Sequence, residues 1–65
     1  MKQHWTIRYT IPIESKNTPG CIWHENHATG VVADTIDDAI ARVRTEFPTC
    51  TIYSVHHAGK IAYVL

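Results

Sequence analysis

The sequence predicts a small α+β domain of ββαββ order, in which one helix covers one face of a four-stranded, mainly antiparallel sheet. Two observations lead to this prediction. Segments in which apolar and polar residues alternate lie on both sides of a single segment with the 3.6-residue period of a helix. The 65 residues contain no internal repeat, linker or low-complexity stretch, so we expect one domain over residues 1–65.

The first predicted strand covers residues 4–13, because polar residues there alternate with the apolar Trp5, Ile7, Tyr9, Ile11 and Ile13. Pro12 has no amide hydrogen to donate, so this end of the strand should lie at an edge or leave the sheet. Residues 14–20 form a turn-rich connection that ends in Pro19-Gly20. Residues 21–23 and 29–33 are then predicted to be extended. The polar residues 24–27 interrupt them as a loop, so either one bent strand or two short strands would fit.

The helix is predicted from Ile36 to Glu46 or Phe47. Thr35 is a good N-cap, with Asp38 three residues later as in a capping box. Pro48 should end the helix, because the residue before a proline is displaced from the α region. The apolar face expected to pack on the sheet consists of Ile36, Ala39, Ile40, Val43 and Phe47.

The C-terminal hairpin is predicted from residues 49–57 and 60–65, joined by the two-residue turn Ala58-Gly59. Regular alternation would place Tyr53, Val55, Ala62 and Val64 on one face. The other face would then carry Ile52, Ser54, His56, Ile61, Tyr63 and Leu65. Both faces would be largely apolar while one helix covers only one of them, so a homodimer is expected. A register shifted by one residue would instead leave a polar outer face and a monomer.

The composition argues against some partners. The formal net charge is zero, which gives no electrostatic reason to expect nucleic acid or a membrane surface. The apolar runs are too short to cross a bilayer, and the start of the chain has no signal-peptide pattern, so we expect a cytoplasmic protein. Two cysteines do not make a disulfide framework, and both thiols are expected to be reduced.

Five histidines are unusual in so short a chain. Cys21, His24 and His27 form a C-x2-H-x2-H pattern that could hold zinc if the loop curls around the ion, with a fourth ligand from His56, His57 or Cys50. The alternative is a polar loop with solvated or hydrogen-bonded imidazoles, which is the interpretation we favour. We predict no cofactor.

The sequence also bears on two further functions. Aromatic residues lie on every predicted strand, beside Arg8 and Lys60, and could form a stacking surface for single-stranded nucleic acid, although the basic residues are few and dispersed. These aromatic residues are Trp5, Tyr9, Trp23, Tyr53 and Tyr63. A thiol-dependent activity lacks an orienting group and an oxyanion site in the sequence, so we expect no enzyme.

The run from Ala33 to Leu65, a capped helix followed by a strand and a short hairpin, resembles the C-terminal part of small accessory proteins of bacteriophages. That resemblance implies a non-catalytic inhibitor of the anti-defence type, which binds a host protein or sequesters a small nucleotide. From the residues themselves we expect an interaction protein whose binding side chains are Trp23, His24, His27, Arg8, His56 and His57.

Overall fold

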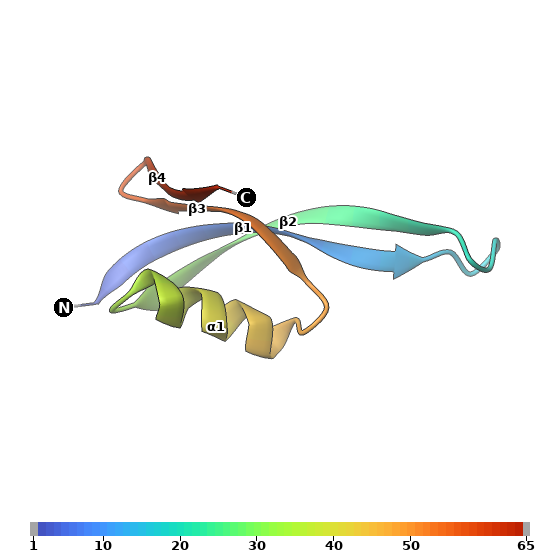
Figure 1. Ribbon diagram of the computed structural model, residues 1–65, viewed down its shortest axis with the longest axis horizontal. Coiled ribbons are helices and arrows are strands. Elements are labelled where there is room, and N and C mark those ends of the chain that lie inside the picture. Colours follow the sequence, from blue (N-terminus) through green and yellow to red (C-terminus); the bar gives the residue numbers. More distant parts are fainter. Residues whose placement is uncertain (1, 65) are drawn as a thin grey trace.

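The computed structural model describes residues 2–64 of the chain. Four strands form one sheet in the order β2-β1-β3-β4, and every neighbouring pair is antiparallel (Figure 1). The predicted ββαββ fold is therefore confirmed. No helix in this described part is long and apolar enough to cross a membrane. The elements are β1 (Gln3–Glu14), β2 (Ile22–Ala33), α1 (Ile36–Glu46), β3 (Thr51–His57) and β4 (Lys60–Val64).

Strands β1 and β2 pair along their whole lengths, from Gln3 opposite Ala33 to Glu14 opposite Ile22. The polar residues 24–27 belong to this ladder, so the prediction of a loop or interruption there is wrong. Their partners on β1 supply a regular set of backbone hydrogen bonds. Strand pairing has overridden the low β-propensity of the polar residues.

The β1–β2 ribbon extends well beyond the rest of the molecule (Figure 1). Strand β3 pairs with β1 only from Trp5 to Thr10. Beyond this point, residues 11–14, residues 22–25 and the connection between them form a two-stranded projection, here called the arm. Pro12 lies in the arm, where β1 has lost β3 as a neighbour, in agreement with the expectation that this end leaves the main sheet.

Helix α1 begins and ends as predicted. The Thr35 hydroxyl accepts a hydrogen bond from the Asp38 amide at 3.1 Å, and Phe47 is the C-cap. The backbone at Thr35 is extended (φ −133°, ψ 160°), as an N-cap requires. Asp37 and Asp38 add negative charge at the positive end of the helix dipole.

The hydrophobic core lies between α1 and one side of the sheet, here called the inner face. Trp5, Ile7 and Tyr9 of β1 are buried there, and the Trp5 indole nitrogen donates to the Ala33 carbonyl at 3.1 Å. The prediction for the helix face is confirmed: Ala39 and Val43 are buried, and Ile36, Ile40 and Phe47 pack against the core.

The β3–β4 hairpin has the predicted two-residue turn, because His57 lies opposite Lys60. Ala58 and Gly59 both have positive φ, as a type I′ turn requires. The predicted distribution of side chains between the two faces is wrong in part, however, because Ile52 and Tyr63 share a face with Val55 and not with Ser54, His56 and Ile61. The β1–β3 register shifts at Tyr53 and the β3–β4 register shifts at Ala62, and each bulge reverses the alternation beyond it.

Residues directly opposite each other share a face, so the inner face of the hairpin carries Ile52, Val55 and Tyr63. The opposite, outer face carries Ser54, His56, Ile61 and Val64. Leu65, which was also assigned to a face, lies outside the described residues.

The centre of the outer face is polar. Strand β1 contributes His4, Thr6 and Arg8 to it, and Thr6 lies opposite both Gly30 and His56. Exposed apolar side chains on this face, such as Ile61 and Val32, belong to the two edge strands and are separated by these polar residues. The continuous apolar seam that we expected on the hairpin is therefore not formed.

Candidate binding groove

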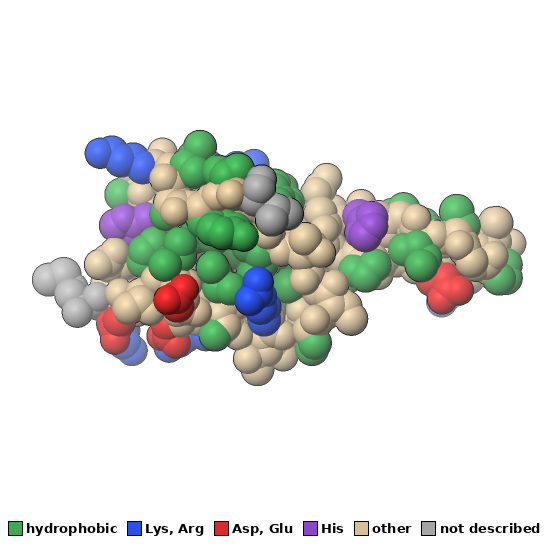
Figure 2. Space-filling view, in the orientation of Figure 1, with side chains coloured by type: hydrophobic (Ala, Val, Ile, Leu, Met, Phe, Trp, Pro, Cys, Tyr) green, Lys and Arg blue, Asp and Glu red, His purple; other side chains and the backbone are tan. Residues whose placement is uncertain are grey.

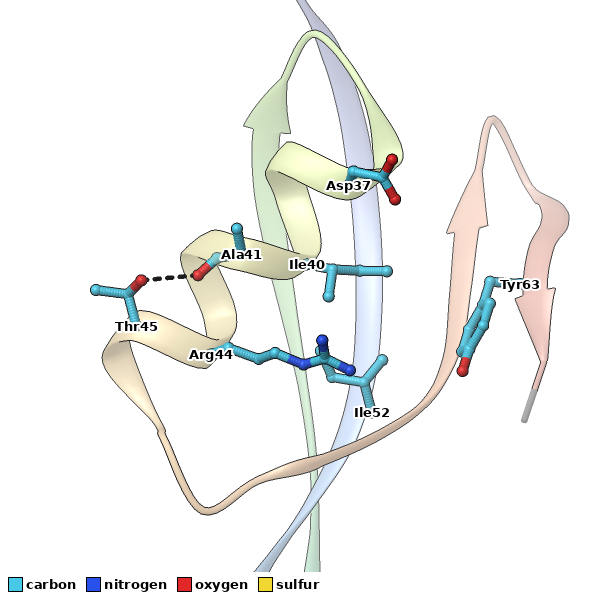
Figure 3. Close-up of a pocket in the computed structure, with 7 residues that line it drawn as sticks. All are labelled: Asp37, Ile40, Ala41, Arg44, Thr45, Ile52 and Tyr63. Atoms are coloured by element: carbon cyan, nitrogen blue, oxygen red, sulfur yellow. Dashed lines mark hydrogen bonds between the residues drawn. The ribbon is translucent and has the colours of Figure 1, made fainter.

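An open groove of about 520 Å³ runs between α1 and the β3–β4 hairpin (Figure 3). It exists because α1 packs mainly over β2 and β1, so that it leaves the inner face of the edge strand β4 open beyond the buried Ile52 and Val55 of β3. Figure 2 shows hydrophobic side chains gathered in this hollow, with basic and acidic side chains beside them. The lining residues are Asp37, Ile40, Ala41, Arg44, Thr45, Ile52 and Tyr63.

The groove has an apolar floor. Ile52 of β3 is 5% exposed, and Ile40 of α1 is half-buried against the same core. Tyr63 stands opposite them on β4 and is 36% exposed (Figure 3). An apolar ligand group that displaced water from these side chains would gain about 25 cal/mol for each Å² of apolar surface removed from water.

The rim of the groove is charged. Asp37 and Arg44 extend from the same side of α1, and the Arg44 side chain points toward Ile52 (Figure 3). Arg44 forms no ion pair with any side chain of residues 2–64. Thr45 is different, because its hydroxyl donates to the Ala41 carbonyl at 2.8 Å. The groove therefore offers an apolar floor, a phenol and one cation able to bind a carboxylate or phosphate.

The predicted zinc ligands do not come together. His24 lies opposite Pro12 on the outer face, whereas His27 lies opposite Tyr9 on the inner face. Cys21 is exposed in the connection that precedes β2. No group of three potential ligands forms among the described residues, and convergence of these three would require β2 to leave its ladder.

Each inner-face histidine contacts an aromatic ring. His27 stacks on Tyr9 with ring centroids 5.6 Å apart, and its Nε2 lies 2.7 Å from Glu25. The His57 ring lies 4.7 Å from that of Trp5. Both imidazole rings therefore contribute to the packing of the inner face.

The predicted binding residues are dispersed over both faces of the sheet. Arg8, His24 and His56 are on the outer face, and Trp23, His27 and His57 are on the inner face. Trp23 is in the arm, whereas His56 and His57 are at the opposite end of the sheet. The proposed aromatic stacking surface also loses two of its members, because Trp5 and Tyr9 are only 8% and 4% exposed.

The sequence did not predict that the groove residues form a site. One signal was present, because Asp37, Ile40 and Arg44 follow the helical spacing i, i+3, i+7 and form a stripe beside the core-facing residues. The other wall could not be found in the same way, since the two bulges decide that Ile52 and Tyr63 face this stripe.

No family model, curated protein or solved structure matches this chain.

Proposed function

We propose that this chain is a non-catalytic interaction module, and that its groove binds an extended segment of a protein through an apolar side chain with a neighbouring acidic group. The observation that carries the proposal is the open groove beside α1, which Ile40, Ile52 and Tyr63 line together with Arg44. An apolar pocket with a few placed polar groups is the usual form of a binding site.

The two kinds of contact have different roles. Burial of an aromatic or aliphatic side chain on Ile52 and Tyr63 supplies affinity, because apolar area is removed from water. Arg44 supplies orientation, because a guanidinium binds a carboxylate in a fixed bidentate geometry. Asp37 at the same rim disfavours a second acidic group, which adds selectivity.

The groove chemistry supports binding rather than a reaction. Its side chains provide an apolar surface and fixed charges, and the two thiols, Cys21 and Cys50, lie outside its lining.

An inhibitor of the phage anti-defence type would use the same groove to bind a host protein. A small nucleotide would instead place a phosphate at Arg44. Both thiols are free, which fits a reducing compartment such as the cytoplasm.

Binding of 8-anilinonaphthalene-1-sulfonate tests the proposal, because this probe combines aromatic rings with an anion. The titration is followed by two-dimensional amide NMR. We expect saturable binding with the largest shifts at Ile40, Arg44, Ile52 and Tyr63. Replacement of Arg44 by Gln should weaken binding about 10-fold or more, because it removes a charge-assisted hydrogen bond.

The matched control is Arg8→Gln, which removes the same charge from the outer face and should leave probe affinity unchanged. Shifts concentrated on the outer face, or equal effects of the two variants, would contradict the proposed site.

A further inference from the structure

The arm exposes the continuation of the inner face. Ile11 and Ile13 follow Tyr9 at alternate positions of β1, and Trp23 lies opposite Ile13. The 11 residues of α1 span about 16 Å, whereas the 12 residues of β1 span about 40 Å. The helix therefore cannot cover the arm, and Trp23 is 47% exposed.

The molecule is more extended than a compact domain of its size. Its radius of gyration is 13.5 Å, compared with about 11 Å for a typical 65-residue domain. Its accessible surface is 4745 Å², compared with about 4,200 Å² for a compact protein of this mass. An isolated two-stranded ribbon is only marginally stable in water. The arm is thus the part of the chain that gains most from a partner.

The arm and the groove are complementary to each other. The arm presents Trp23 and Ile13 with the acidic Glu25 two residues away on the same face, and the groove presents an apolar floor under Arg44. Both surfaces are on the inner side of the sheet, and Figure 2 shows hydrophobic side chains along the arm and in the groove in one view. Within one chain the two surfaces lie in different parts of the elongated molecule (Figure 1), so one arm cannot fold back into its own groove without breaking the β1–β2 ladder.

We propose that the occupant of the groove is the arm of a second copy of this chain, in a two-fold dimer in which each arm lies in the groove of the other chain. This inference rests on the proposed function and names the partner of that site. A two-fold axis repeats the arm-in-groove contact, so both arms and both grooves are covered at once. Trp23 packs on Ile52 and Tyr63 of the partner. Glu25, whose Oε1 contacts His27 of its own chain, directs its second carboxylate oxygen to the partner's Arg44.

The area required agrees with this arrangement. If two chains buried about 2,500 Å² between them, their combined accessible surface would equal that of one compact protein of twice the mass. A buried area of this size is in the range of stable homodimers. The zero net charge of the chain places no overall repulsion between copies. The polar outer face stays in solvent on both sides of the dimer.

Site-directed cross-linking tests the contact between arm and groove. In a Cys21→Ser, Cys50→Ser background, one protein carries Glu25→Cys and a second carries Arg44→Cys. After mixing under mild oxidation, we expect the mixed disulfide to form at least about 10-fold faster than with Arg8→Cys as the second protein, because proximity raises the effective concentration. Equal rates with the two second proteins would overturn the proposal.

Sedimentation equilibrium provides an independent test. We expect the wild-type mass to be twice 7.4 kDa and the dimer affinity of Trp23→Lys to fall about 30-fold or more, as for a central aromatic anchor. Ile61→Lys introduces the same charge at an exposed outer-face position and should remain dimeric. Circular dichroism verifies that both variants are folded. A wild-type monomer at high micromolar concentration would reject the dimer, and probe binding by that monomer would leave the proposed function intact.

Discussion

The rings of Tyr9 and Phe47 stack with their centroids 5.3 Å apart and an interplanar angle of 26°. Tyr9 lies in the centre of the sheet, and Phe47 is the C-cap of α1. The Tyr9 ring also stacks with His27 of β2. This pair therefore fixes the C-terminal end of the helix at the point where the main sheet continues into the arm.

Replacement of Phe47 by Ala should destabilise the protein by about 2 kcal/mol, below the cost for a fully buried phenylalanine because Phe47 is half-buried. Urea denaturation followed by circular dichroism measures the change. Phe47→Leu, which keeps most of the apolar volume, should retain at least half of the lost stability. An unchanged midpoint in Phe47→Ala would show that the helix end does not depend on this contact.

The bulges in the hairpin predict a large effect on stability for one isoleucine and a small effect for another. Ile52 is 5% exposed on the inner face, whereas Ile61 is 65% exposed on the outer face. Ile52→Ala should cost about 2 to 5 kcal/mol, and Ile61→Ala less than about 0.5 kcal/mol. Thermal unfolding of the two variants compares them directly, and similar losses would refute the register described above.

The hydroxyl of Thr35 should have a measurable effect on helix stability. Thr35→Ala removes the acceptor for the Asp38 amide and should cost about 1 kcal/mol. Thr35→Ser keeps the hydroxyl and should behave like the wild type in the same denaturation experiment. If the serine variant were as unstable as the alanine variant, the methyl group of Thr35, rather than the cap, would be responsible.

Substitutions in the β3–β4 turn should change the free energy of unfolding in a predictable direction. Ala58 has a φ of 53°, a conformation that costs an alanine about 1 kcal/mol. Ala58→Asn creates the Asn-Gly pair favoured in type I′ turns and should raise the free energy of unfolding by up to about 1 kcal/mol. Gly59→Ala, at a φ of 77°, should lower it by a similar amount. A melting temperature that fell in Ala58→Asn would contradict the assigned turn geometry.

The local signals in the sequence determined the type and order of the elements. Thr35, the apolar spacing of the helix, Pro48 and Ala58-Gly59 act through the chain immediately around them, so each could be interpreted without knowledge of its partners. The same applies to the core-facing side of α1, because the 3.6-residue period defines one face of a helix wherever it packs.

Only the tertiary structure decided which side chains meet. Strand pairing turned the polar residues 24–27 into part of a 12-residue strand, and this separated His24 from His27. The bulges at Tyr53 and Ala62 placed Ile52 and Tyr63 beside α1. The physical reason is that a strand has a period of two, so one unpaired residue exchanges the faces of all residues beyond it, and whether a residue is paired depends on a strand far away in the sequence.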